Sequence, residues 1–235
     1  MEKYYLKPEI HRRLGNILSK CIKLFNAKHL EYFLVSGSLL GCVRIGGIYP
    51  WDDDCDICVF DVETLLSLKN EFNKVGLDLI VVNKYLVKIF EINGYRKEKV
   101  NYWLEEIKEV LCRNKNINRC EAMKLASLSY VKQKPKYYTY PFVDVKIMVN
   151  EGGCCSFLNP YWKGNLYYPL KTVPFYIGGL KLNVNIPSKT KQYLDLCYPH
   201  NEDVLMIITN KHSREKSRRI IFPRSFYKGL CYQRT

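Results

Sequence analysis

The sequence predicts an α+β fold in which helices flank a mixed β-sheet. Segments with the apolar spacing of helices are intermixed with short segments of strand character along the 235 residues. The composition is 47% hydrophobic and 26% charged, which is typical of a globular protein and excludes a disordered or fibrous chain. From this length we expect a single domain over residues 1–210 and a basic C-terminal tail over residues 211–235.

The N-terminal region predicts a helix, a strand and a second helix. Residues 8–28 carry an apolar stripe at helical spacing. Residues 32–35 form a short apolar run that leads into Ser36-Gly37-Ser38, which predicts a strand followed by a turn. We expect a short helix to begin there and to stop before Gly46 and Gly47.

The next segment predicts a central strand with one polar end. Residues 54–60 alternate acidic and apolar side chains before becoming fully apolar. Asp61 is placed to cap the helix that follows it. Residues 79–82 and 86–92 then predict a strand hairpin.

The second half of the chain begins with a change of character. Residues 96–130 interleave charged and apolar side chains, which predicts a helical insertion. A tyrosine-rich connection over residues 135–141 leads to a strand at 142–149, whose single acid is Asp144. Three further elements are predicted: strands at 166–175 and 180–184, which form a hairpin, and a helix from 187.

Asp52, Asp54 and Asp56 predict a metal site. In a strand, side chains two residues apart share a face, so these carboxylates project together. Mg²⁺ or Mn²⁺ relieves their repulsion through oxygen ligation, and two such ions can clamp an in-line phosphoryl displacement. Asp144 is suited to complete the site because a buried carboxylate without a partner is costly. The alternative for Asp144 is a water-exposed acid at a strand end.

Ser36-Gly37-Ser38 lies where a strand becomes a helix, so its N–H groups and hydroxyls can receive phosphate oxygens. Taken alone, this tripeptide is also an ordinary helix cap. Arg44 lies between the tripeptide and the acids and offers a permanently charged fork for phosphate, or else a surface salt bridge.

Residues 36–57, SGSLLGCVRIGGIYPWDDDCDI, resemble the signature of the LicD family, which also contains the fukutin and fukutin-related transferases. Residues 141–145 resemble the second acidic strand of that family, and residues 168–171 its later aromatic-Pro-Leu-Lys segment. Residues 186–198 resemble its closing helix. The sequence departs from the family pattern at Cys55, at Val145-Lys146 and at Tyr198-Pro199.

The resemblance implies a nucleotidyltransferase-like fold and the transfer of phosphocholine or a polyol phosphate. The donor would be a CDP-activated alcohol, and the acceptor a hydroxyl of a glycan or glycolipid. Position by position, it implies Asp54 and Asp56 as metal ligands for Mg²⁺ or Mn²⁺, with Asp144 as third ligand or base and Asp52 as a further candidate ligand. The donor phosphates would contact four residues: Gly37, Ser38, Arg44 and Lys171.

Formal charge and hydropathy limit the partners and the location. A net charge of +14 favours anionic partners, so an anionic membrane surface is a further candidate partner. Residues 211–235 contain eight Lys or Arg and only Glu215 as an acid, consistent with either a solvated tail or an anion-binding segment. The start lacks the apolar core of a signal peptide and no run has membrane-span length, so we expect a soluble cytoplasmic protein.

Cysteine spacing gives no specific metal motif. Cys55 and Cys58 have CxxC spacing, but an offset of three in a strand points the two thiols to opposite faces. Cys154 and Cys155 leave both a metal site and disulfides open.

Two other functions stay open. One keeps the fold but attaches nucleotides to RNA or a small molecule, although the acidic block over residues 50–54 argues against it and makes a nucleic-acid partner the weaker prediction. The other is a catalytically silent anion-binding protein, which the cost of an unused carboxylate cluster disfavours.

Overall fold

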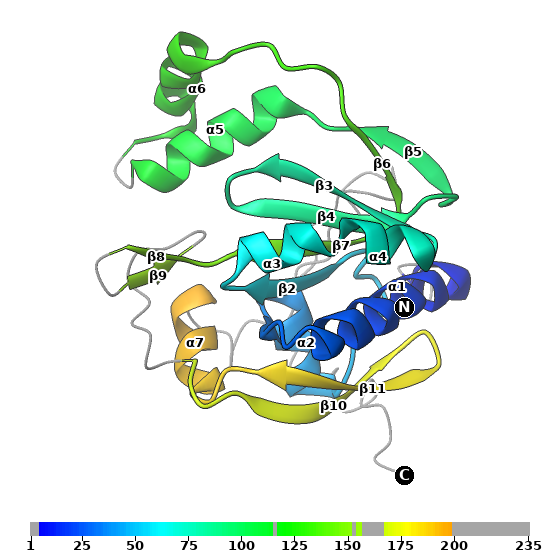
Figure 1. Ribbon diagram of the computed structural model, residues 1–235. Helices are drawn as coiled ribbons and strands as arrows, with labels where there is room; N and C mark the ends of the chain where they lie inside the picture. The colour runs from blue at the N-terminus through cyan, green and yellow to red at the C-terminus, as the bar shows by residue number, and fades with distance from the viewer. Residues whose placement is uncertain (1–4, 115–116, 152–153, 157–166, 199–235) are drawn as a thin grey trace.

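A five-stranded mixed sheet forms the centre of the computed structural model, which describes residues 5–114, 117–151, 154–156 and 167–198 (Figure 1). The strands are arranged in the order β1-β2-β7-β4-β3. Only β2 and β7 are parallel among these neighbours, so the predicted mixed sheet is confirmed. Their bounds are β1 Tyr32–Leu34, β2 Cys55–Val59, β7 Phe142–Ile147, β4 Leu86–Glu91 and β3 Leu77–Asn83.

Helix α1 (Pro8–Ala27) follows the predicted range and lies between the central sheet and a separate hairpin (Figure 1). That hairpin consists of β10 (Lys171–Ile177) and β11 (Leu180–Ile186), paired along their full length. The apolar stripe of α1 is buried in one hydrophobic core together with the sheet and the hairpin. Burial of this stripe against the sheet and the hairpin explains why its spacing predicted the helix well.

Four shorter helices surround the sheet. Their bounds are α2 Ser36–Ile45, α3 Val62–Ser67, α4 Lys69–Lys74 and α7 Thr190–Cys197. The single helix predicted after Asp61 is divided into two, α3 and α4, at Leu68. Gly46 ends α2 in a left-handed conformation with φ of 79°, which a glycine adopts without a Cβ penalty. Asp61 caps α3 by accepting a hydrogen bond from the backbone N–H of Thr64, as predicted.

The segment predicted as a helical insertion is helical only in part. Helices α5 (Tyr102–Arg113) and α6 (Arg119–Ser129) lie at the far end from α1, but residues 96–99 form strand β5 (Figure 1). Strand β5 (Arg96–Lys99) pairs with β6 (Tyr137–Tyr140), which we had predicted as a connection without regular structure. Cations of β5 lie over tyrosine rings of β6, a long-range pairing that neither segment's apolar pattern reveals.

The two faces of β7 differ in chemistry. Val143, Val145 and Ile147 belong to the main hydrophobic core, whereas Asp144 and Lys146 alternate with them and point the other way. The remaining strands, β8 (Val149–Glu151) and β9 (Cys154–Ser156), form a small hairpin.

Two further predictions concern membrane spans and the C-terminal tail. Among the residues that the structure describes, no helix is long and apolar enough to cross a membrane. The predicted basic tail, residues 211–235, lies outside the described residues.

Candidate metal centre

The carboxylates of Asp54, Asp56 and Asp144 meet at the polar face of the central sheet. Asp56 lies on β2 and is the register partner of Asp144 on the parallel strand β7, while Asp54 directly precedes β2. One oxygen from each of the three carboxylates lies within 4.8 Å of the other two. The structure therefore brings together the three acids that the sequence analysis selected as ligands.

Asp52 lies beside this group but is not part of it. Its backbone carbonyl accepts a hydrogen bond of 2.8 Å from Nε2 of His11, a buried residue of α1. Its carboxylate lies at α2, where a Cβ on Gly37 would come within 3.1 Å of Oδ2. Burial, followed by the charge of Asp54, raises the pKa of Asp52 well above its ordinary value. Asp52 thus packs against the start of α2 rather than joining the three clustered acids.

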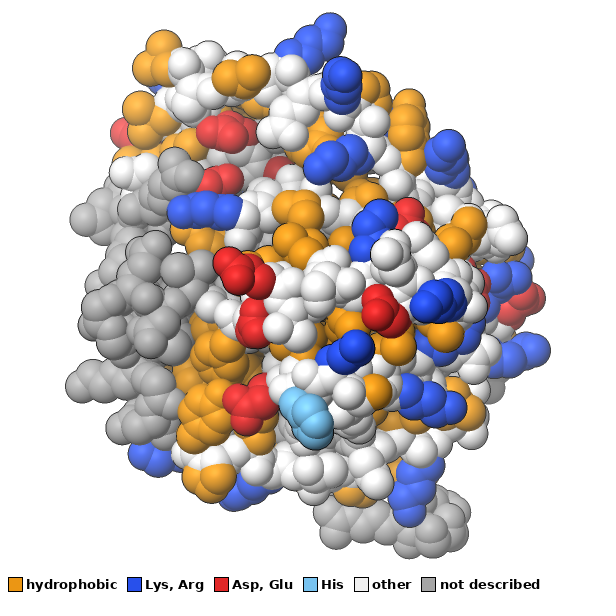
Figure 2. All heavy atoms as spheres, viewed as in Figure 1, with side chains coloured by type: hydrophobic (Ala, Val, Ile, Leu, Met, Phe, Trp, Pro, Cys, Tyr) orange, Lys and Arg blue, Asp and Glu red, His pale blue; other side chains and the backbone are white. Residues whose placement is uncertain are grey.

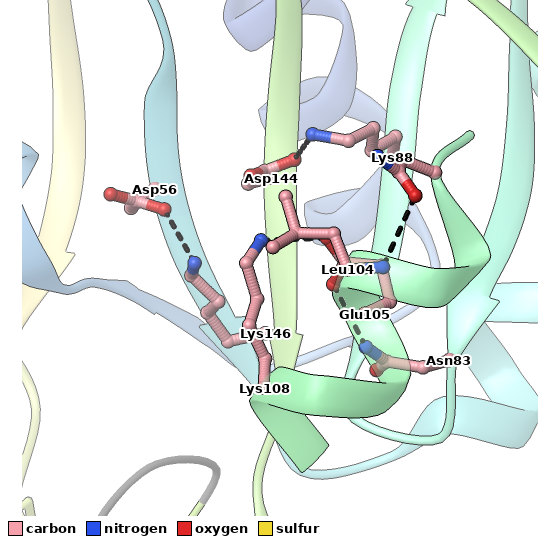
Figure 3. Close-up of polar contacts among 9 residues, drawn as sticks. Asp56, Asn83, Lys88, Leu104, Glu105, Lys108, Asp144 and Lys146 are labelled. Carbon is pink, nitrogen blue, oxygen red and sulfur yellow. Dashed lines mark hydrogen bonds and ion pairs between the residues drawn. The ribbon is translucent and has the colours of Figure 1, made fainter. Parts of the chain in front are cut away.

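Two lysines that were not predicted as site residues pair with the acids. Nζ of Lys88 lies 2.6 Å from Oδ1 of Asp144, and Nζ of Lys146 lies 3.0 Å from Oδ1 of Asp56 (Figure 3). Lys88 is the cross-strand partner of Asp144 on β4, and Lys146 follows Asp144 by two residues on the same face of β7. Lys146 could have been noticed from the sequence, because it stands where the chain departs from the family pattern. Lys88 could not, because it pairs with Asp144 only through the order of the strands in the sheet.

Burial and neighbouring charge shift the ionisation of the site. Burial raises the pKa of Asp56 to about 6; the charge of Lys146 opposes this rise, and those of Asp54 and Asp144 add to it. Burial alone would lower the pKa of Lys146, but the charges of Asp56 and Asp144 raise it overall, so Lys146 stays protonated. The acids are therefore crowded enough that added positive charge stabilises them.

The start of α2 is built against β2. The hydroxyl of Ser38 is buried and accepts a 2.9 Å hydrogen bond from the backbone N–H of Asp56, which ties the helix start to the acidic strand. Ser36 has φ of 51°, a left-handed conformation that residues other than glycine rarely adopt. The side chain of Ser38 thus positions Asp56, a role that the sequence did not reveal.

The other two predicted phosphate contacts lie further along their elements. Arg44 lies in the last turn of α2, at the opposite end of the helix from Gly37, and is half-buried. Lys171 is the exposed first residue of β10. Their roles in donor binding stay predictions.

The donor set fits a hard divalent cation. Three carboxylates supply the oxygen ligands that Mg²⁺ and Mn²⁺ prefer. Oδ1 of Asp56 is buried and already contacts one cation, the ammonium of Lys146, at 3.0 Å. The site is thus one in which positive charge is needed beside buried carboxylate oxygens.

Aromatic residues lie beside the acidic segment. The rings of Tyr49 and Trp51 stack with centroids 5.1 Å apart, and Trp51 is buried. The phenol of Tyr198, after α7, lies close enough that the charges of Asp56 and Asp52 contribute to a raised pKa, although burial is the larger cause. Tyr198 is a further residue near the site that the residue pattern did not assign to it.

The family comparison decides the identity of this arrangement. The nucleotidyltransferase domain model described as LicD/FKTN/FKRP matches residues 29–189, which include all three clustered acids and the start of α2. The chain belongs to the LicD family. This confirms the resemblance found in the sequence.

One curated relative matches a shorter part of this chain than the family model does. The uncharacterized protein RP689 of Rickettsia prowazekii (strain Madrid E) is 26% identical over 117 residues, which represent 42% of this chain. The matched region spans 44% of that relative, so the chain covers less than half of its length.

Proposed function

We propose that this LicD-family protein moves phosphocholine or a polyol phosphate from a CDP-activated alcohol to a hydroxyl of a glycan or glycolipid. The observation that carries the proposal is the meeting of Asp54, Asp56 and Asp144 next to the start of α2, within the region matched by the family model. Mg²⁺ or Mn²⁺ held by these carboxylates would supply positive charge to the phosphoryl oxygens.

Other residues of the protein would bind the donor and position the acids. Backbone N–H groups at the start of α2 would receive donor phosphate oxygens, since a helix N-terminus favours anions. The missing side chain at Gly37 leaves room there for Asp52 and for the donor. Ser38 holds the backbone of Asp56 in place, and Arg44 and Lys171 are proposed to contact the diphosphate.

Two roles are open to Asp144. It is 6% exposed and its Oδ1 accepts a 2.6 Å hydrogen bond from Nζ of Lys88, and we propose it as a third ligand or as a base toward the acceptor hydroxyl. The second role requires the acceptor hydroxyl to reach hydrogen-bond distance of the Asp144 carboxylate.

Donor profiling tests the proposal. Purified protein with Mg²⁺ or Mn²⁺ is incubated with CDP-choline, CDP-ribitol or CDP-glycerol and cell-derived glycans, and CMP release is measured. We expect one donor to give acceptor-dependent CMP. No CMP from any donor, together with consumption of a nucleoside triphosphate, would support nucleotide transfer to RNA or a small molecule instead.

Asp54→Asn links the activity to the carboxylates. We expect it to abolish CMP release while circular dichroism and the cooperative unfolding transition are preserved. Asp78→Asn is the matched control, because Asp78 is an acid of β3 paired with Lys69 outside the cluster. Full activity in Asp54→Asn would refute the assignment of this acid.

A further inference from the structure

Lys88 is a built-in cation of the carboxylate cluster. It is 7% exposed, its Nζ contacts Oδ1 of Asp144 at 2.6 Å, and the same Nζ lies 3.5 Å from the ring centre of Phe142. The ring of Tyr138 lies on a further side at 5.0 Å. An ammonium group enclosed in this way has exchanged water for two aromatic faces and one carboxylate, so it stays with Asp144.

Lys146 holds a different position, with its ammonium beside Asp56. It lies on the same face of β7 as Asp144 and forms its ion pair with Asp56 of the neighbouring strand (Figure 3). The charges of Asp56, Asp144 and Asp54 all act on it. Its ammonium therefore balances the charge of several acids of the cluster, whereas the ion pair of Lys88 is with Asp144.

Counting charge shows how many ions the cluster can take. Within the three-acid cluster, Asp54, Asp56 and Asp144 carry three negative charges when ionised, and the two lysines return two positive charges, which leaves one negative charge. The neighbouring Asp52 is left out of this count because burial raises its pKa well above the ordinary value. One divalent cation turns this balance to +1, which suits an anionic donor, and a second would raise it to +3. Like charges at separations of a few ångströms repel strongly in a partly buried site.

We infer that Lys146 takes the place of one of the two cations that such a carboxylate cluster can hold, so that the site binds a single divalent cation. The inference rests on the proposed function, since it assumes that the three acids bind a metal. It assigns to Lys146 a positioning role, through Asp56, that the usual apolar residue at this place in the family pattern cannot fill.

Counting Mn²⁺ by electron paramagnetic resonance tests this without donor, acceptor or turnover. The wild-type chain is titrated with Mn²⁺, and we expect one tightly bound ion per chain. In Lys146→Met we expect two, because the place and the charge of the ammonium are vacated; Lys146→Arg keeps the charge and should bind one. Lys69→Met is the matched control, as it removes a lysine paired with Asp78 outside the cluster, and should also bind one.

Two bound ions in the wild type, or one in both the wild type and Lys146→Met, would overturn the inference while leaving the proposed function intact. No bound ion in any variant would instead remove the metal-dependent function on which it rests. The two failures are therefore distinguishable.

Thermal unfolding gives a second measurement, which tests the inference even if Lys146→Met is less stable than the wild type. In chelator, Lys146→Met leaves Asp56 without its buried partner, and we expect its Tm to fall by about 5–10 °C. Mn²⁺ should restore most of that loss, and should raise the Tm of Lys69→Met no more than that of the wild type. Equal responses to Mn²⁺ in Lys146→Met and the wild type would contradict the role of Lys146.

Discussion

The two faces of the β2-β7-β4 layer differ in chemistry: one is apolar and the other carries charged side chains. One face carries aliphatic residues such as Ile57 and Val145, fully buried against α1. The other carries Asp56, Asp144 and Lys88 in a row across three strands, joined by cross-strand register. Because side chains alternate, the same few residues of backbone both close the core and display the site. The packed core therefore holds the side chains of the site in fixed positions.

The space-filling view shows how different the outer surface is from either face. Basic side chains are spread over the visible face, with acidic ones between them rather than in one field (Figure 2). On this face the basic side chains thus form no single patch, whereas the carboxylate cluster gathers three acids at one place. This contrast favours anionic substrates approaching a site that needs its own counter-charges.

The largest expected effect comes from the polar face. Asp56→Asn removes one ligand from the three clustered acids, and we expect acceptor-dependent CMP release to fall by about 10³-fold or more, since metal ligation contributes several kcal/mol to phosphoryl transfer. Steady-state CMP release at saturating donor measures the effect. Activity within tenfold of the wild type would show that the two faces are less distinct in function than in chemistry.

The neighbouring residue on the apolar face should behave in the opposite way. Ile57 is fully buried, so Ile57→Ala leaves a cavity that we expect to lower the free energy of unfolding by about 2–5 kcal/mol. Urea denaturation followed by circular dichroism measures this loss. CMP release per folded molecule should stay close to the wild-type rate, and a specific loss of turnover without a loss of stability would break the comparison.

The sequence predicted these two faces unequally. The apolar face followed from periodicity alone, and the single acid within residues 142–149 was enough to select Asp144. The partners of the acids were not predictable, because Lys88 reaches Asp144 only through the order of β4 and β7 in the sheet. Strand β5 was missed for the same reason, since its alternating charges become a strand only against the tyrosines of β6. Local pattern fixes burial, whereas register between distant segments decides which charges meet.

The pH dependence of stability should separate Asp56 from the core. Its folded pKa of about 6 lies above the ordinary value of 3.8, so the folded state holds more protons than the unfolded state between these values. The metal-free protein should therefore lose up to about 3 kcal/mol of stability through Asp56 as pH rises from 4 to 7. Urea denaturation in chelator, compared between the wild type and Asp56→Asn, measures the difference. Parallel pH profiles would contradict it.

The smallest effect concerns Asp61, an acid five residues beyond Asp56 that serves structure alone. Its Oδ1 accepts the backbone N–H of Thr64 at 2.9 Å and its Oδ2 accepts the Thr64 hydroxyl. Asp61→Ala should lower the free energy of unfolding by about 1 kcal/mol through loss of the helix cap, with Mn²⁺ binding unchanged.

The sign of its pH dependence is opposite to that of Asp56. Hydrogen bonds from Thr64 lower the pKa of Asp61, so its contribution is present above the unfolded pKa and is lost as pH falls through the folded one. Urea denaturation of Asp61→Ala and the wild type at pH 3 and pH 7 measures this, and the difference between them should shrink at the lower pH. A difference that grows on acidification would mean that Asp61 shares the electrostatic environment of the cluster, and the division between an acid that caps a helix and acids that await a cation would fail.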